Sequence, residues 1–385
     1  MPITMNVYFD NAATTWVRSE VIDAMTAIMH MEYGNPSSPH YMGRNAAKAL
    51  AAARKSIADV FSAKANEIFF TSGGTEADNW AIMGCAEMLA RGSSKHIITS
   101  TIEHDAVLEP IKKLEKNGWE VTYLSPNMDG VILAESFADA LREDTAFASI
   151  MFVNNETGAI NPIETYGKEI KKRKLSTVLH VDAVQAYGKI AFRAGSLGAD
   201  LISISAHKIH GPKGIGALYI KGGNKAGIKL PPLILGGGQE SGFRAGTEAL
   251  PAIVGFAKAA SLCSTEQVEN TLVVEKLRKY ITSQLEETFP DIFVIGNDTS
   301  PYILSISLPG YKSEVLMSFL EGEGICVARS AACKKGARSR VLEMMGLSNE
   351  IIDAALRVSF SPYNTQDEAE YFIEMLKKAL ATLRK

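Results

Sequence analysis

One stretch decides the fold of this chain: Asp200-Leu201-Ile202-Ser203-Ile204-Ser205-Ala206-His207-Lys208-Ile209-His210-Gly211-Pro212-Lys213-Gly214. Its first part is a short apolar run that ends in a polar, glycine-rich turn, which is typical of a buried β-strand. Lys208 stands in that turn. A lysine that forms a Schiff base needs a semi-buried, partly desolvated amine, and neighbouring hydroxyl or imidazole groups can hold a cofactor phosphate. Ser205, His207 and Lys208 supply these groups together, although most lysines in such turns are ordinary surface residues.

The same alternation of strand and polar turn extends over residues 67–220. Short β-rich runs alternate there with amphipathic stretches, which indicates βαβ units and a mostly parallel sheet in an α/β fold. A helix is expected from His104 to Lys116, because its apolar residues recur at a period of about 3.6. The predicted strands are residues 68–71, 96–99, 120–124, 148–153, 178–182, 201–204 and 217–220.

Polar residues follow five of these strands, at the carboxyl edge where α/β sheets place their ligand sites. They are Ser72-Gly73-Gly74-Thr75-Glu76, Glu103-His104, Asn154-Asn155-Glu156-Thr157-Gly158, Asp182 with Gln185, and Ser205 with His207 and Lys208. The glycine turn would offer backbone amides to a phosphate at a helix start. A buried Asp182 needs a positive partner such as a protonated pyridine nitrogen, and His104 could lie flat on that ring. Each residue alone is better explained as a tight turn, a core aspartate or a helix-start histidine, but their occurrence together with Lys208 favours one shared site.

The composition excludes several classes of protein. With 385 residues, 46% of them hydrophobic, the chain is expected to bury a large core. A net charge of -3 offers no general attraction for nucleic acid. The chain has no uninterrupted apolar run of about 18 residues and no secretory pattern at its start, so we expect a cytoplasmic protein without a membrane span. The four cysteines lack the paired spacing of metal ligands, so we expect reduced thiols and no metal site, with Cys85 and Cys326 buried.

Three parts of the chain are expected from its organisation. Residues 1–15 form an N-terminal segment that contributes to the site, residues 16–250 form the large α/β domain, and residues 251–385 form a small α+β domain that carries Cys333. A glycine-rich stretch at 236–242 indicates a loop, and the pattern from Pro251 to Phe289 predicts a long helix that links the two domains.

Seven motifs lie in order along nearly the whole chain. They are Tyr8-Phe9-Asp10-Asn11-Ala12-Ala13-Thr14-Thr15, Thr71-Ser72-Gly73-Gly74-Thr75-Glu76, Glu103-His104, Asn154-Asn155-Glu156-Thr157-Gly158, His180-Val181-Asp182-Ala183-Val184-Gln185, Ser205-Ala206-His207-Lys208 and Gly246-Thr247-Glu248. Together they resemble the cysteine desulfurases, which are class V aminotransferase relatives of fold type I that use pyridoxal phosphate. The resemblance implies a large domain with a mostly parallel seven-stranded sheet, a small α+β C-terminal domain, and a homodimer.

The resemblance also implies a role for each site residue. Lys208 would bind the cofactor covalently, Asp182 would pair with the pyridinium and His104 would stack on the ring. The implied cofactor-binding set is Gly74, Thr75, His104, Asn155, Asp182, Gln185, Ser205, His207, Lys208 and Thr247. Within this set, Gln185 would reach the phenolic oxygen, and Thr75, Ser205 and His207 would bind the phosphate. Thr247 would bind the phosphate from the neighbouring subunit. The implied substrate-binding set is Asn11, Ala13, Asn155 and Arg357, and the implied catalytic set is Lys208, Cys333 and His104.

Cys333 stands where the family carries its sulfur-accepting thiol. Arg329, Lys334 and Lys335 lie nearby in sequence and favour the thiolate, which is the form that attacks sulfur. The resemblance therefore implies that L-cysteine is converted to L-alanine with a persulfide on Cys333, which passes sulfur to an acceptor such as an iron–sulfur scaffold or a tRNA-thiolation carrier. The family commonly has Ser-Gly-Ser-Ala-Cys at this point, so the stretch 328–336 departs from its pattern. Two alternatives stay open from the sequence: a selenocysteine or cysteine-sulfinate lyase of the same fold, and a catalytically silent interaction protein.

Overall fold

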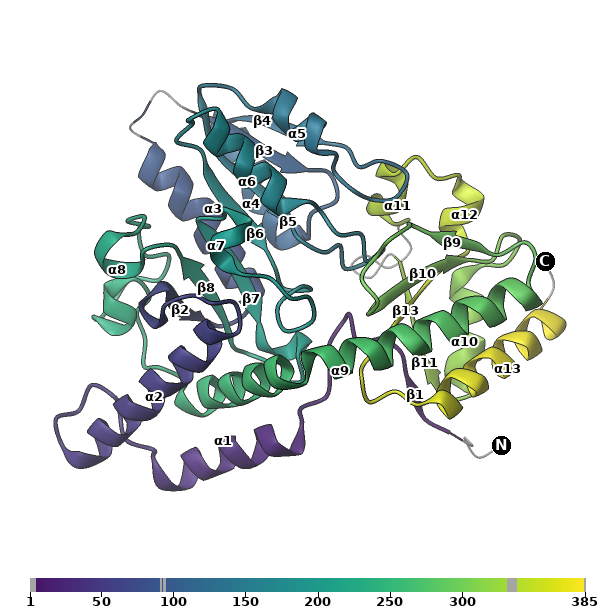
Figure 1. Ribbon diagram of the computed structural model, residues 1–385, viewed down its shortest axis with the longest axis horizontal. Helices are drawn as coiled ribbons and strands as arrows, with labels where there is room; N and C mark the ends of the chain where they lie inside the picture. Colours follow the sequence, from purple (N-terminus) through teal and green to yellow (C-terminus); the bar gives the residue numbers. More distant parts are fainter. Residues whose placement is uncertain (1–4, 91, 93–94, 331–337, 384–385) are drawn as a thin grey trace.

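The computed structural model describes residues 5–90, 92, 95–330 and 338–383, and its largest sheet has seven strands in the order β2-β8-β7-β6-β5-β3-β4 (Figure 1). The strands are β2 (Ile68–Thr71), β3 (His96–Ser100), β4 (Glu120–Leu124), β5 (Thr145–Met151), β6 (Val178–Asp182), β7 (Leu201–Ser205) and β8 (Gly216–Ile220). β8 runs antiparallel to both of its neighbours, and the other neighbouring pairs are parallel. The predicted α/β class and the mostly parallel seven-stranded sheet are confirmed, although β5 begins at Thr145 rather than at Ala148.

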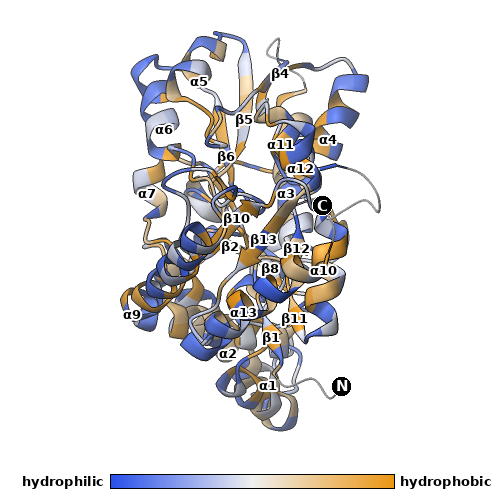
Figure 2. Ribbon diagram, turned by 90° about the vertical axis from the view of Figure 1, so that its right-hand side faces the viewer, coloured by the Kyte–Doolittle hydropathy of each residue, from blue (hydrophilic) through white to orange (hydrophobic). Residues whose placement is uncertain are grey.

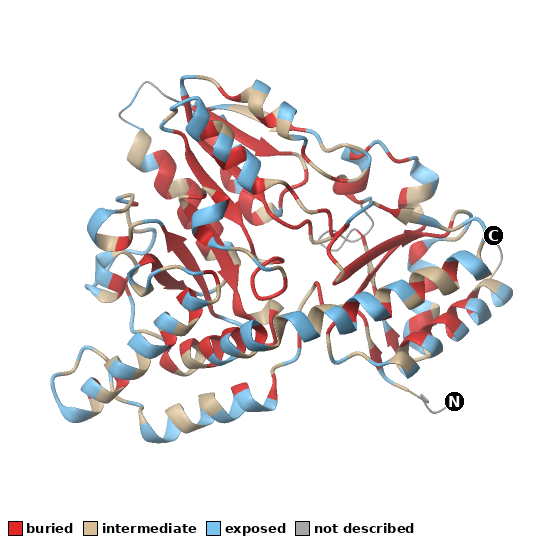
Figure 3. Cartoon of the chain, in the orientation of Figure 1, coloured by how far each residue is buried: buried red, intermediate tan, exposed pale blue. Residues whose placement is uncertain are grey.

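The inner strands of this sheet are buried on both faces, which is why they read as continuous apolar runs. The edge strand β2 is covered on both faces as well, because Phe69 packs with α3 and α4, whereas Ile68 and Phe70 belong to the cluster on the opposite face. Figure 3 shows buried residues along these strands and exposed residues on the outer sides of the helices. The helices around the sheet are α2 (Tyr41–Asp59), α3 (Gly74–Leu89), α4 (Asp105–Lys116), α5 (Ala134–Ala140), α6 (Ile163–Lys172), α7 (Ala194–Leu197) and α8 (Gly223–Ala226).

A second, four-stranded antiparallel sheet lies in the C-terminal part, in the order β12-β13-β10-β9. Its elements and their neighbours are β9 (Phe293–Ile295), β10 (Ile303–Ser307), α10 (Ser313–Gly322), β11 (Ile325–Cys326), β12 (Ala328–Arg329), α11 (Arg340–Met344), α12 (Asn349–Asp353), β13 (Ala355–Ser359) and α13 (Gln366–Thr382). In Figure 2 these strands are largely hydrophobic and the covering helices carry hydrophilic stretches, as packing on one side requires.

One long helix joins the two parts, as the sequence predicts. α9 spans Leu250–Thr288, and its early residues such as Phe256 pack on the large sheet, whereas Ile281 packs in the C-terminal core. The helix α1 (Ser19–Met31) lies beside α9. The proposed domain limits at residues 15 and 250 stay a prediction.

The N-terminal strand joins the C-terminal part of the molecule rather than the large sheet. β1 (Val7–Tyr8) pairs in parallel with β11, and Phe9 is buried in the C-terminal hydrophobic cluster. Cys85 is buried as expected, but the expectation for Cys326 is wrong, because this edge position of β11 leaves its side chain exposed. In the part of the chain that the structure describes, none of the helices has the length and apolar character needed to span a bilayer.

Candidate active site

A cavity of about 340 Å³ opens at the carboxyl ends of β2, β3, β5, β6 and β7. Its lining residues are Ala12, Ala13, Gly74, Thr75, Asp78, His104, Met151, Val153, Asn155, Asp182, Val184, Gln185, Ser205, His207, Lys208 and Arg357. The predicted cofactor-binding residues therefore line one cavity, with the exception of Thr247. Of the predicted substrate-binding residues, Ala13, Asn155 and Arg357 line it and Asn11 does not.

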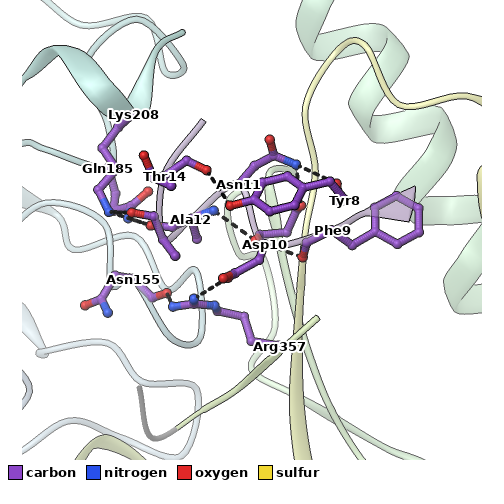
Figure 4. A network of polar contacts seen from close by, with 12 residues as sticks. Tyr8, Phe9, Asp10, Asn11, Ala12, Thr14, Asn155, Gln185, Lys208 and Arg357 are labelled. Atoms are coloured by element: carbon purple, nitrogen blue, oxygen red, sulfur yellow. Dashed lines mark hydrogen bonds and ion pairs between the residues drawn. The ribbon is translucent and has the colours of Figure 1, made fainter. Parts of the chain in front are cut away.

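Lys208 reaches this cavity from the short helical turn Ala206–Lys208 that follows β7. Its Nζ donates hydrogen bonds to the carbonyl oxygens of Ala12 and Ala13, at 2.6 and 2.7 Å. Gln185 Nε2 donates to the same Ala12 oxygen at 2.8 Å (Figure 4). The N-terminal segment also contacts the backbone of the lysine turn, because the N–H of Thr15 donates to the His207 carbonyl at 2.9 Å. The N-terminal segment therefore lies directly against the lysine turn.

Two buried carboxylates face the cavity, of which the sequence analysis found only one. Asp182 ends β6, and burial raises its pKa, while the hydrogen bond that Asp182 accepts from the Val184 backbone N–H at 2.9 Å and the nearby charge of Lys208 oppose that rise. Asp78 stands one turn inside α3, and burial together with the charge of Asp182 raises its pKa well above the ordinary value. Asp78 lies four residues after Gly74, so helical periodicity could have placed it on the same face. A cationic N–H group in the cavity would relieve the burial cost of these carboxylates.

Another part of the cavity, at the start of α3, suits an anion. Here α3 begins at Gly74, so its first backbone N–H groups have no partner within the helix. A Cβ atom on Gly74 would lie 2.8 Å from Val184 Cγ2, and one on Gly216 would lie 2.7 Å from the carbonyl carbon of Gly73, so both glycines are needed for this close packing. The Ser205 hydroxyl is buried and has no hydrogen-bond partner among the described residues. A phosphate oxygen would supply that partner.

The two histidines of the site are held in fixed orientations. His104 is the N-cap of α4, and its Nδ1 accepts a hydrogen bond from the backbone N–H of Ala106 at 3.1 Å. His207 Nδ1 lies 3.2 Å from the Thr14 hydroxyl. Burial, assisted by the charge of Lys208, lowers the pKa of His207 to about 4. The His207 ring is therefore neutral near neutral pH.

Arg357 reaches the cavity from the middle of β13, in the C-terminal sheet. Its side chain is only 2% exposed, and its Nη2 forms an ion pair with Asp10 at 2.8 Å. Nη1 donates to the Asn155 carbonyl at 2.7 Å (Figure 4). Nε is buried and lacks a hydrogen-bond partner within the described part of the chain. One N–H of a guanidinium fork is thus available to a carboxylate in the cavity.

Two predicted site residues, Asn11 and Thr247, lie outside the lining of the cavity. Asn11 holds the N-terminal segment to β13, because its Nδ2 donates to the Ser359 carbonyl at 3.0 Å. Thr247 is exposed and does not line the cavity of its own chain. Cys333 lies outside the described residues, so its position relative to the cavity stays a prediction.

A larger cavity, of about 480 Å³, lies in the C-terminal part beside Ser330 and Arg338. Its charged side chains are largely paired with one another: Arg338 binds Asp353 at 2.7 Å and Arg329 binds Glu314. Size therefore does not identify the active site here. The smaller cavity at the strand ends combines a lysine, buried carboxylates and hydrogen-bonding groups without partners, and these are the features of a reactive site.

Comparisons with known proteins agree with this choice. Residues 7–372 match the family model described as aminotransferase class-V. A protein named cysteine desulfurase IscS, from Methanosarcina thermophila, is 41% identical over 98% of this chain and 93% of its own length. The solved structure of a NifS-like protein shares a TM-score of 0.92 and 40% identity, covering 98% of this chain and all of its own. Another structure, SspA in complex with cysteine, has a TM-score of 0.82 and 32% identity over 94% of this chain and all of its own.

Proposed function

This chain belongs to the cysteine desulfurases of the aminotransferase class-V family, and from that premise we propose that the strand-end cavity binds pyridoxal phosphate and takes sulfur from L-cysteine. The observation that carries the proposal is the placement of Lys208 in one cavity with the buried Asp182. The donor set fits the cofactor: a lysine for its aldehyde, a carboxylate for its ring nitrogen, and the orphaned Ser205 hydroxyl with the α3 N-terminus for its phosphate.

When bound, pyridoxal phosphate supplies an electron sink for the bonds that break at the substrate. The residues of the chain supply the rest. Asp182 would hold the ring nitrogen of the bound cofactor in its protonated form, and His104 would lie against the ring. Lys208 Nζ takes the proton from the substrate Cα. Arg357 and Asn155 hold the substrate carboxylate and so fix which atoms lie beside Lys208.

Cys333 is the proposed sulfur acceptor. Its thiolate attacks the sulfur of L-cysteine, so an S–S bond forms on Cys333 as the Cβ–S bond of the substrate breaks. The electron pair of the broken bond stays with the substrate carbon, and its protonation yields L-alanine. The persulfide then passes its outer sulfur to an acceptor protein.

A homodimer completes the proposal. Thr247 follows the glycine-rich loop and is exposed in its own chain, so we assign it to the phosphate site of a second copy. The identity of the sulfur acceptor and the cytoplasmic location stay predictions from the sequence.

Mass spectrometry after addition of L-cysteine tests the proposal. The full-length protein should gain one sulfur atom on Cys333 and release an equal amount of L-alanine. Borohydride reduction of the protein before cysteine is added should attach the cofactor irreversibly to Lys208. Cys333→Ser should keep the cofactor spectrum and lose the persulfide. If Cys333→Ser still forms alanine and sulfide at the native rate, the role of Cys333 is wrong and a lyase activity replaces it.

A further inference from the structure

A second lysine, which the mechanism does not use, is buried directly behind the site. Lys189 follows β6 by a single turn and is only 8% exposed. Its Nζ donates a hydrogen bond to Gln185 Oε1 at 3.1 Å and lies 5.6 Å from the centre of the Tyr302 ring. Among the described residues, no carboxylate forms an ion pair with it. An isolated ammonium group is costly to bury, and an apolar side chain would fill the same space with less penalty.

The surroundings of Lys189 are otherwise positive or weakly polar. Lys189 and Lys208 both border a small cavity of about 20 Å³, which has room for about one water molecule. Burial, together with the charges of Lys208 and Arg357, lowers the pKa of Lys189 to about 7. The other titratable groups that face it are those of Cys263, His207 and His210. The surrounding charges therefore do not stabilise the Lys189 ammonium group. The contact that can explain this buried lysine is its hydrogen bond to Gln185.

The contact with Gln185 determines which way the glutamine amide points. Lys189 Nζ donates to Gln185 Oε1, so the glutamine turns its oxygen toward Lys189, and the protonated form of the lysine can only donate and holds it there. The amide nitrogen then points in the other direction, where it donates to the Ala12 carbonyl at 2.8 Å. Ala12 O is also the acceptor for Lys208, at 2.6 Å. If the amide were reversed, two pairs of like groups would face each other: two donors at Lys189 and two acceptors at Ala12.

We propose that Lys189 is a positioning residue that acts through Gln185, holding the amide so that its N–H groups, and not its oxygen, face the N-terminal segment and the cavity. The cavity then offers a donor to an anionic oxygen on a bound aromatic ring, and the Ala12 carbonyl stays in place against Lys208. This inference rests on the proposed function, because the ring in question is that of pyridoxal phosphate.

Cofactor binding to the full-length protein tests the proposal without measuring turnover. Pyridoxal phosphate is removed, and its rebinding to the folded protein is followed by the quenching of tryptophan fluorescence. Lys189→Met removes both the donor and the charge. Lys189→Gln removes the charge and shortens the side chain by one bond, but its amide can still donate to Gln185. Lys213→Met is the matched control, because it removes an exposed lysine from the turn that carries Lys208.

The loss of one buried donor should weaken cofactor affinity by roughly 3- to 10-fold in Lys189→Met. Lys189→Gln should recover most of that loss, and Lys213→Met should bind as the wild type does. Wild-type affinity in a folded Lys189→Met overturns the inference, and so does a Lys189→Gln variant that binds as weakly as Lys189→Met. If Lys189→Met does not fold, Lys189→Ala, which also removes the donor, replaces it in the same comparison with the same outcomes. If the wild type itself fails to bind pyridoxal phosphate, it is the proposed function that fails.

Discussion

Replacing Arg357 with lysine should selectively weaken the binding of L-cysteine. The guanidinium is fully buried, its Nη2 is already paired with Asp10, and its Nε has no partner in the described part of the chain. The substrate carboxylate can therefore accept a hydrogen bond from Nε and share Nη2 with Asp10. A lysine cannot reproduce this fork. One charge-assisted hydrogen bond contributes about 1.5–3 kcal/mol, so kcat/KM should fall roughly 10- to 150-fold.

The loss should appear in KM rather than in kcat, because the carboxylate contact exists before and during the chemical step. The assay is alanine formation as a function of L-cysteine concentration. A matched control is Arg278→Lys, which changes a half-buried guanidinium that donates to the Thr299 carbonyl and does not line the cavity. That variant should lose stability and keep its KM.

Cysteamine, which has no carboxylate, sharpens the same test. Its inhibition constant should be equal in the wild type and in Arg357→Lys. Cysteamine has no carboxylate, so it cannot form the contact with residue 357 in either protein. If Arg357→Lys folds, keeps its cofactor spectrum and shows an unchanged KM for L-cysteine, Arg357 does not hold the substrate carboxylate.

Three further predictions concern the scaffold of the site. Burial raises the pKa of Glu103 from its ordinary value of 4.5 to about 8, so the stability of its protonated form is present at low pH and is lost as pH rises between these two values. Glu103→Gln should therefore flatten the fall of Tm between about pH 5 and 8, and an unchanged slope would contradict this. Glu240→Ala leaves the half-buried Arg54 guanidinium without its 2.6 Å partner and should cost about 1.5–3 kcal/mol in urea unfolding. A Cβ atom on Gly216 would lie 2.6 Å from a strand carbonyl oxygen, so Gly216→Ala should lower Tm and cofactor affinity, whereas Gly195→Ala, with open space around it, should leave both near the native values.

The large sheet could be predicted because its inner strands are buried on both sides. A strand such as Leu201–Ser205 is buried along its whole length, so its local apolar sequence is enough to predict it. β1 could not be predicted in this way, because two residues show no periodicity and its partner β11 lies more than three hundred residues later in the chain. The exposure of Cys326 has the same origin, since only the edge position of β11 decides it.

The site could be predicted in part for a related reason. Chain topology brings the ends of parallel strands to one edge, so the polar residues after five strands had to lie together. Asp78 was missed because it stands inside a helix, where its approach to the cavity depends on the angle at which α3 packs. Arg357 was assigned only through the family resemblance, because nothing local to β13 indicates that its side chain crosses to the large sheet.

The N-terminal segment explains how residues from the two sheets come to share one cavity. Its strand β1 and the side chain of Phe9 belong to the C-terminal core. Asp10 then binds Arg357 from that core, and two residues later the Ala12 carbonyl accepts from Lys208 of the large sheet. Asp10 and Ala12 are only two positions apart in the sequence, so a movement of the segment that changes the Asp10–Arg357 contact also changes the Ala12–Lys208 contact. The position of Arg357, the proposed carboxylate-binding residue, and the orientation of the Lys208 amine therefore both depend on one short piece of chain, which Gln185 also contacts and to which the proposed action of Lys189 extends.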